Sequence, residues 1–353
     1  MNTFRQFEQQ VKYVPLTTSW YLADLGEARG RQELFTRQSP QKLKVLREHA
    51  LIESAVSSNR IEGVQVDRAR IGTVLFGKSH LRDRDEEEVR GYRDALKLIH
   101  EQGTRLRITE ELIRDLHRLC RAGLGDAGQY KERDSDIVEK YPDGRQRVRF
   151  ATVKAADTPG YILGLAESWD RCLRERWVHP LIALAAFNLD FLCIHPFRDG
   201  NGRMSRLPML AGCYQLGYEV GRYISLERLI EENKERYYET LESSSQGWHE
   251  AKHDPWPLIN FLLYVLKLAY GEFERRVGQT ASPKGAKTEM VEAAVESMTD
   301  SFTVNDLERA CPGVSRDMVR RVLRGLKDAG RVEALGRGPG ALWRKRGSTL
   351  KKG

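Results

Sequence analysis

The longest apolar run of the sequence, Leu181–Ile194, is the feature that most constrains how this chain can fold. It holds 14 residues with only two polar interruptions, which is too short to cross a bilayer core of about 30 Å. The run therefore predicts a helix buried inside the protein. Pro196 stops that helix, and a polar, glycine-containing segment follows at 195–203 (HPFRDGNGR). The helical pattern resumes at Met204, so this segment is predicted to be a loop at the N-terminus of a second helix.

The loop has the composition of a phosphate-transfer site. Gly200 and Gly202 lack a Cβ, so backbone amides at the helix N-terminus can approach an anion closely. Arg203 supplies guanidinium donors for phosphate oxygens, and Asp199 supplies a carboxylate suited to Mg²⁺ beside nucleotide phosphates. His195 is a base suited to an incoming hydroxyl. No Walker lysine pattern is present, which excludes a P-loop ATPase.

These nine residues resemble the signature of the Fic family, H-P-F-x-[D/E]-G-N-G-R, at every fixed position. The resemblance implies a helical fold that transfers AMP from ATP, with Mg²⁺, to a hydroxyl side chain of a protein, including this protein itself. It assigns proton removal to His195, metal binding to Asp199 and the departing phosphates to Arg203. The nucleotide-binding residues that it implies are Phe197, Arg198, Gly200, Asn201, Gly202, Arg203, Tyr237 and Tyr238, with Phe197 as a buried anchor.

An upstream segment, Ser58–Gly63 (SNRIEG), resembles the family's inhibitory motif, [S/T]-x-x-x-E-[G/N]. On a helix Ser58 and Glu62 share a face, and Gly63 can let the chain leave that helix. The resemblance implies that Glu62 pairs with Arg203 and takes the place of the γ-phosphate, so that ATP binds unproductively. We therefore expect an autoinhibited enzyme whose inhibitory helix precedes the catalytic core.

One segment interrupts the helical pattern of the first 277 residues. Ile137–Val138 and Val148–Phe150 flank turn-forming residues, which predicts a β-hairpin within residues 133–152. Family members hold the acceptor protein against such a flap by strand addition. Two positions depart from the family pattern: Lys131 replaces the commoner arginine, and Ser245 stands where some adenylylating relatives have asparagine. Nucleotide specificity stays open at this point.

The net charge of +8 is concentrated at one end of the chain. From Cys311 to Gly353 there are 12 lysines and arginines but only three acidic residues, so the rest of the chain is close to neutral. After a polar stretch at 278–287, which we interpret as a linker, residues 288–346 read as three helices and a hairpin. This order resembles a winged helix-turn-helix module.

The third of these helices is the predicted DNA-binding element. Its basic residues recur every three or four positions on one face, and a further arginine lies at the predicted wing tip. The predicted DNA-contacting residues are Arg316, Arg320, Arg324, Lys327 and Arg337. A solvated face or a protein-binding module is the alternative interpretation.

The sequence thus predicts a mainly α protein with an N-terminal helical region (1–105), a catalytic core (106–277), a linker (278–287) and a winged module (288–346). Five cysteines without a C-x-x-C pair indicate reduced thiols, and the N-terminus lacks an apolar leader segment. We therefore expect a cytoplasmic protein without membrane contact. The family resemblance also suggests a homodimer.

The sequence also permits three alternative interpretations. His249–His253 (HEAKH) matches the zinc motif H-E-x-x-H with Glu272 as a third ligand, but Gly247 and Asp254–Pro255 leave barely one helical turn, which disfavours zinc. A second alternative is a DNA-binding regulator whose Fic core senses nucleotides. A third is a transferase that moves UMP, phosphate or phosphocholine.

Overall fold

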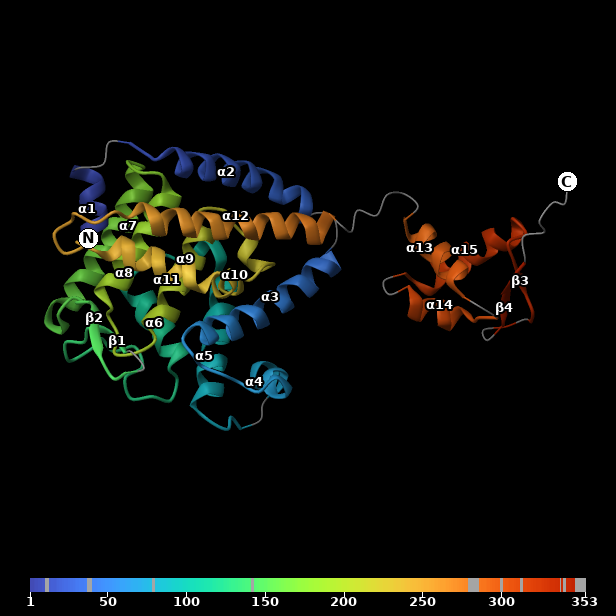
Figure 1. Ribbon diagram of the computed structural model, residues 1–353, viewed down its shortest axis with the longest axis horizontal. Coiled ribbons are helices and arrows are strands. Elements are labelled where there is room, and N and C mark those ends of the chain that lie inside the picture. Colours follow the sequence, from blue (N-terminus) through green and yellow to red (C-terminus); the bar gives the residue numbers. More distant parts are fainter. Residues whose placement is uncertain are drawn as a thin grey trace. The chain divides into compact units, whose positions relative to one another are not determined.

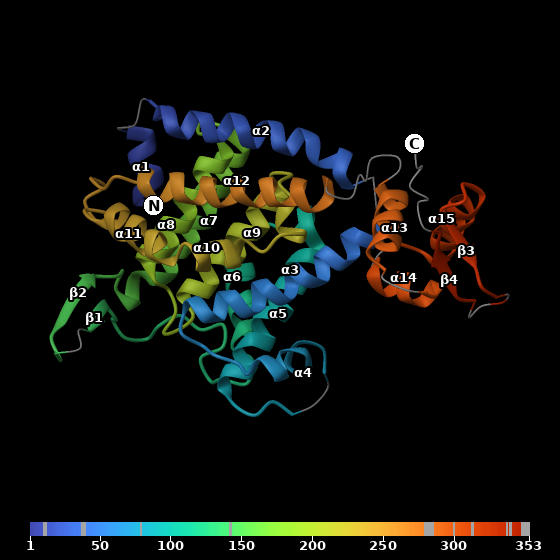
Figure 2. The same ribbon diagram turned by 45° about the vertical axis from the view of Figure 1, so that its right-hand side comes forward.

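The computed structural model describes residues 1–9, 13–36, 40–77, 80–140, 143–278, 286–298, 301–311, 314–336, 338 and 341–346. The chain forms two compact units, Met1–Arg275 and Arg276–Gly353. Both units are mainly helical, and each carries a two-stranded antiparallel sheet (Figures 1 and 2). The predicted mainly α fold class is confirmed.

The helices are α1 (Asn2–Gln9), α2 (Leu16–Thr36), α3 (Pro40–Ile61), α4 (Ile71–Phe76), α5 (Arg84–Gln102), α6 (Glu110–Cys120), α7 (Thr158–Glu175), α8 (Pro180–Ile194), α9 (Asn201–Gln215), α10 (Leu226–Glu232), α11 (Lys234–Ser245), α12 (Trp256–Gly278), α13 (Ala286–Ser297), α14 (Val304–Ala310) and α15 (Arg316–Asp328). The strands are β1 (Ile137–Lys140), β2 (Gln146–Phe150), β3 (Val332–Ala334) and β4 (Trp343–Lys345). Short 3₁₀ helices lie at Arg68–Arg70, Gly103–Arg105, Ala155–Asp157 and Val220–Arg222.

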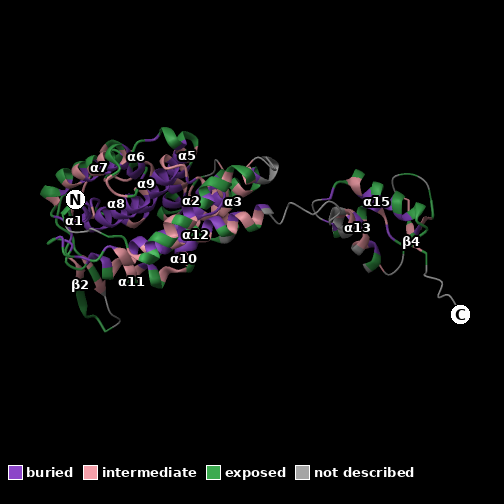
Figure 3. Cartoon of the chain, turned by 90° about the horizontal axis from the view of Figure 1, so that it is seen from above, coloured by how far each residue is buried: buried purple, intermediate pink, exposed green. Residues whose placement is uncertain are grey.

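Helix α8 is the centre of the first unit's core. Every residue from Leu181 to Ile194 is buried, and α8 packs against α1, α7, α9 and α11 (Figure 3). Pro180 occupies the first turn, where its missing N–H costs no hydrogen bond, and His195 ends the helix in the left-handed region with φ 53°. The predicted buried helix is confirmed. Its last residue delivers the polar loop directly to α9.

Helices α3, α5 and α6 surround this loop from the other side. Helix α5 packs against α3, α6 and α9. It begins at Asp83, whose side chain accepts a hydrogen bond from the Glu86 amide at 3.0 Å, and acidic residues fill its first turn. This capping fixes where α5 starts, and it places Arg84 and Glu88 beside the loop. Helices α2 and α12 run side by side and are joined by the Thr18–Asn260 hydrogen bond of 2.7 Å (Figures 1 and 2).

The predicted hairpin is present as β1 paired with β2, with Val138 opposite Val148. Residues 141–142 of its turn lie outside the described part of the chain. Arg149 joins the hairpin to α11, because its guanidinium donates to the Tyr238 carbonyl at 3.0 Å and pairs with Glu242 at 3.0 Å. The hairpin therefore has a fixed position beside the paired tyrosines.

The second unit contains α13, α14, α15 and the β3–β4 hairpin, in the order that the sequence predicted. Thr303 and Asp306 form a capping box on α14, and Ser315 caps α15. Its core includes Val291, Leu307 and Leu323. Of the predicted linker, residues 279–285 lie outside the described chain. Among the helices that are described, none is long and apolar enough to span a membrane.

Candidate active site

The loop at 195–203 is held in shape by its own side chains. Asn201 Oδ1 accepts a hydrogen bond from the Phe197 amide at 2.9 Å, and Asn201 Nδ2 donates to the Phe197 carbonyl at 2.7 Å. Gly200 has φ 84°, a conformation that favours glycine, and it caps the N-terminus of α9. Phe197 is fully buried, which supports its predicted role as an anchor. The Asn201 side chain is engaged within the loop.

His117 of α6 packs against the loop, a role that the sequence analysis did not predict. Its ring stacks on Phe197 at 3.7 Å between centroids, and its Nε2 lies 3.2 Å from the Asp199 carbonyl. Its Nδ1 accepts a hydrogen bond from the Gly128 amide, so Nε2 carries the proton and donates. Burial lowers the pKa of His117 to about 4, which keeps the ring neutral. A single histidine on an amphipathic helix gave no signal of this role.

His195 is held by its neighbours on both sides along the chain. Lys131 donates from its backbone amide to the Pro196 carbonyl at 2.9 Å and from Nζ to the Ile194 carbonyl at 3.3 Å. Burial and then the charge of Lys131 lower the pKa of His195 to about 4. The ring is therefore neutral at neutral pH, as a general base requires.

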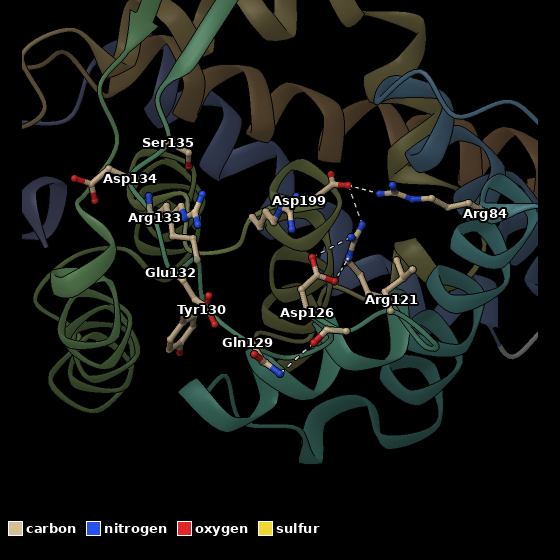
Figure 4. A pocket seen from close by; sticks show the side chains of 14 residues that line it. Arg84, Arg121, Asp126, Gln129, Tyr130, Glu132, Arg133, Asp134, Ser135 and Asp199 are labelled. Carbon is tan, nitrogen blue, oxygen red and sulfur yellow. Dashed lines mark hydrogen bonds and ion pairs between the residues drawn. The ribbon is translucent and has the colours of Figure 1, made fainter.

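Asp199 lies on the other face of the loop, and its carboxylate pairs with two arginines. Its Oδ2 accepts hydrogen bonds from Arg84 Nη2 at 2.5 Å and Arg121 Nη1 at 2.8 Å, as the dashed lines in Figure 4 show. Burial raises the pKa of Asp199, but the charges of Arg121, Arg203 and Arg84 outweigh it and hold the pKa below its usual value. The carboxylate opens on a cavity of about 970 Å³, which Arg198 also lines.

The surroundings of Asp199 fit Mg²⁺ when a nucleotide binds with the ion. Its side chain is 45% exposed, and a single carboxylate is typical of Mg²⁺ sites that share the ion with nucleotide phosphates. Arg84 and Arg121 already contact this carboxylate, so a cation gains little there by itself. Phosphate oxygens offset the guanidinium charges, and the site therefore fits the ion together with a nucleotide.

The predicted pairing of Glu62 with Arg203 is wrong. Arg203 Nη1 instead donates to Glu88 Oε2 at 2.5 Å and to Asn59 Oδ1 at 2.9 Å. Glu62 pairs with Arg206, whose Nη2 lies 2.9 Å from Glu62 Oε1. The reason is helical spacing, because Arg206 lies three residues beyond Arg203 and so presents its side chain near the same face of α9.

Arg206 also contacts the first residue of the predicted inhibitory motif. Its Nε donates to Ser58 Oγ and its Nη2 to the Ser58 carbonyl, both at 2.9 Å. Glu62 lies directly over the loop, since a Cβ added at Gly202 would overlap its carboxylate. Gly63 has φ 89° and turns the chain away after α3 ends. The structure thus brings the motif onto the start of α9, through an arginine outside the predicted loop.

A second cavity, of about 180 Å³, adjoins His195. It is bordered by Glu62 and Gly202 at the loop, and by the hairpin at Ile137 and Phe150. Helix α11 completes the wall with Tyr237, Tyr238, Leu241 and Ser245. The structure therefore gathers the two predicted tyrosines and the predicted base, His195, around one space, together with Ser245.

The residues of the H-E-x-x-H sequence are used elsewhere. They lie in turns after α11, where His249 Nε2 contacts the Ala151 carbonyl at 2.7 Å and His253 Nε2 contacts Thr3 Oγ1 at 2.9 Å. Glu272 pairs with Arg228 through both carboxylate oxygens. Within the described residues, no group of three or more histidine, cysteine, aspartate or glutamate side chains could hold a metal ion.

The predicted DNA-contacting residues differ in their surroundings. Arg320, Arg324 and Lys327 are exposed on α15, as is Arg321, which the sequence reading left out. Arg316 instead pairs with Glu308 at 3.3 Å, and Arg337 lies outside the described residues. Other cations of the unit are paired as well: Arg331 with Glu292 and Glu296, and Arg344 and Arg346 with Glu333. Among the described residues of this unit, the exposed positive charge without an acidic partner is concentrated on α15.

Known proteins resemble this chain in sequence and in fold. Residues 107–211 match the Fic/DOC family. A protein of Nematostella vectensis named protein adenylyltransferase Fic is 26% identical over 230 residues, which cover 60% of this chain and 46% of that protein. The chain thus spans less than half the length of this curated relative.

Two solved structures show the same fold. A Fic family protein from Desulfovibrio desulfuricans G20 has a TM-score of 0.60 and 23% identity, covering 96% of this chain and 98% of its own. A Fic domain containing signaling protein from Bacteroides thetaiotaomicron has a TM-score of 0.61 and 20% identity, covering 72% and 97%. The helical scaffold around the loop is therefore the Fic fold.

Proposed function

We propose, from the premise that residues 107–211 form a Fic/DOC family domain, that this protein is an autoinhibited protein adenylyltransferase. It transfers AMP from ATP to a hydroxyl side chain of a protein. The observation that carries this proposal is the neutral His195 ring beside a cavity bordered by Tyr237 and Tyr238, with the Glu62 carboxylate against Gly202.

The chemistry follows from these positions. The acceptor oxygen attacks the α-phosphorus while His195 takes the hydroxyl proton, and the bond to the β-phosphate breaks to release pyrophosphate. The first amides of α9, around Gly202, face the developing negative charge at a helix N-terminus. Asp199 would hold Mg²⁺, which supplies charge neutralisation for the nucleotide phosphates. Tyr237 and Tyr238 provide aromatic surface for the base.

Autoinhibition rests on the contacts of the α3 end. Glu62 brings a negative charge to Arg206 and covers Gly202, which is where an anionic nucleotide would otherwise bind. The Glu62 carboxylate and a nucleotide phosphate are both negatively charged, so they repel each other when both contact Arg206. A nucleotide therefore binds in a productive geometry only after Glu62 leaves Arg206.

The test compares Glu62→Gly with the parent protein. We expect Glu62→Gly to raise incorporation of label from α-labelled ATP into protein by about tenfold or more, since one charge interaction of about 1.4 kcal/mol corresponds to a factor of ten. His195→Ala in the same background should abolish it. Label from γ-labelled ATP, or from α-labelled UTP in preference to ATP, would indicate transfer of another group. No increase with any of these donors would contradict autoinhibition by Glu62.

We further propose that the second unit binds DNA as a winged helix-turn-helix. The exposed Arg320, Arg324 and Lys327 of α15 support this proposal, because unpaired cations along one helix can neutralise successive phosphates. A homodimer and a cytoplasmic location stay predictions of the sequence. The alternative of a DNA-binding nucleotide sensor differs from the main proposal only in lacking transfer activity.

A further inference from the structure

Glu88 of α5 is a buried carboxylate on which three guanidinium groups converge. Its side chain is 5% exposed. Its Oε1 accepts from Arg84 Nε at 2.8 Å and from Arg121 Nη1 at 3.3 Å, and its Oε2 accepts from Arg203 Nη1 at 2.5 Å. The three arginines come from the start of α5, the end of α6 and the start of α9. No pattern in the sequence indicated this convergence.

Two of these arginines are shared with Asp199. Arg84 and Arg121 each bond Glu88 Oε1 and Asp199 Oδ2, so each guanidinium lies between the two carboxylates (Figure 4 shows the Asp199 side). Without Glu88, both would direct their full charge to Asp199. Arg203, whose Nη2 lies 3.8 Å from Asp199 Oδ1, would add a third positive charge. The negative charge of Glu88 therefore limits how strongly Asp199 is neutralised.

We propose that Glu88 is the positioning residue of this site: it draws Arg84, Arg121 and Arg203 away from Asp199 and so keeps that carboxylate able to bind a divalent cation. The inference rests on the proposed function in one respect, since the cation is the one that a nucleotide brings. It adds a residue that touches neither nucleotide nor acceptor, and that acts through the charges beside Asp199.

A neighbouring residue shows what a purely structural glutamate looks like on the same helix. Glu86 is also buried, and it bonds Arg70 through both oxygens and the Arg82 amide. None of these partners contacts Asp199. Loss of Glu86 takes the ion-pair partner from the half-buried Arg70, and loss of Glu88 takes one of several partners from the buried Arg121 and Arg203, so either loss lowers stability. Only loss of Glu88 changes the charge beside Asp199, and this difference separates the two roles.

The experiment uses the full chain in the Glu62→Gly background with Mn²⁺ as the probe. Binding of Mn²⁺ in the presence of ADP is measured from the electron paramagnetic resonance signal of free Mn²⁺. We expect Glu88→Gln to raise the Mn²⁺ dissociation constant by about tenfold, the effect of one charge interaction. ADP binding without metal should not weaken, because the added positive charge attracts phosphate. A merely structural role would weaken both.

A second variant removes an exposed side chain and should change the Mn²⁺ dissociation constant in the opposite direction. Arg84 is 54% exposed, so Arg84→Gln should fold, and it takes one guanidinium away from Asp199. We expect it to lower the Mn²⁺ dissociation constant by about threefold, as for a partly exposed ion pair. An unchanged or higher value for Arg84→Gln would overturn the proposal even if Glu88→Gln failed to fold.

Three controls complete the test. Glu88→Asp keeps the charge and should stay within about threefold of the parent in Mn²⁺ affinity. Glu86→Gln removes a buried carboxylate and Glu87→Gln an exposed one, and both should leave Mn²⁺ affinity unchanged. Equal effects of Glu86→Gln and Glu88→Gln would overturn the proposal. Because Mn²⁺ binding needs no transfer activity, absence of label in Glu62→Gly would contradict the proposed function without deciding the role of Glu88.

Discussion

At the scale of single residues, the protonation state of His195, the proposed base, depends on burial and on a lysine that departs from the family pattern. Lys131 contacts the carbonyls on both sides of His195 and donates from Nζ to Thr152 Oγ1 at 2.7 Å. Burial lowers the pKa of Lys131 to about 8, so the amine is charged at neutral pH. That charge helps to keep His195 neutral, and the same side chain fixes its backbone.

The substitution Lys131→Met should therefore shift the acid side of the pH–activity profile to higher pH. Burial still lowers the pKa of His195 in this variant, but removal of the positive charge raises that pKa above its value of about 4. A larger fraction of His195 is then protonated in mild acid and cannot accept the hydroxyl proton. In the Glu62→Gly background, labelling should be nearly constant from pH 8 down to about pH 5, whereas Lys131→Met should lose activity at the acid end of that range.

Lys131→Arg provides the matched control for this charge effect. It keeps the positive charge, so its activity should show the same acid limb as the parent even where its maximal rate falls. A titration of the His195 ring by nuclear magnetic resonance gives an independent readout. An acid limb that stays in place in Lys131→Met would show that burial alone sets the pKa of His195.

At the scale of elements, the contact that we propose to be inhibitory joins the C-terminal end of α3 to the first turns of α9. The motif residues could be identified from the sequence, because they match a local pattern and share a helix face. Their partner could not, since Arg203 and Arg206 are one turn apart on α9, and only tertiary packing brings Arg206 to Glu62 while Arg203 contacts Asn59 and Glu88. Arg203 pairs with Glu88, whereas Arg206 pairs with Glu62 and donates a hydrogen bond to Ser58.

Ser58→Ala should therefore activate the enzyme partially. The change removes the Oγ that accepts from Arg206 Nε, while the Ser58 carbonyl and Glu62 keep their bonds. A lost hydrogen bond of about 1 kcal/mol corresponds to about a fivefold rise in labelling, less than for Glu62→Gly. Ser57→Ala makes the same change one residue earlier and should have no such effect. Equal labelling in Ser58→Ala and the parent would show that Glu62 alone holds the α3 end.

At the scale of the whole molecule, patterns local in sequence were predicted well. The buried helix α8, the hairpin and the helical fold class follow from apolar runs, turn residues and periodicity. The surroundings of the site do not, because His117, Glu88 and Arg121 reach the loop only through the packing of α5 and α6 against α9. The net charge of residues 311–353 overstated the positive charge that is free to bind DNA. Arginines of this segment pair partly with Glu292, Glu296 and Glu308, which precede residue 311.

The division into two units leads to a prediction about DNA. If α15 contacts phosphates, Arg320→Gln with Arg324→Gln should weaken binding of the full chain to duplex DNA and reduce the slope of log affinity against log salt by about two. The matched control is Arg344→Gln with Arg346→Gln, because those cations already pair with Glu333 and should change the slope less. Label incorporation by the Glu62→Gly protein should be the same in both double variants, since α15 belongs to the second unit and the catalytic loop to the first. Salt-independent binding, or equal slopes for the two variants, would instead indicate that the basic face of α15 contacts a protein or only water.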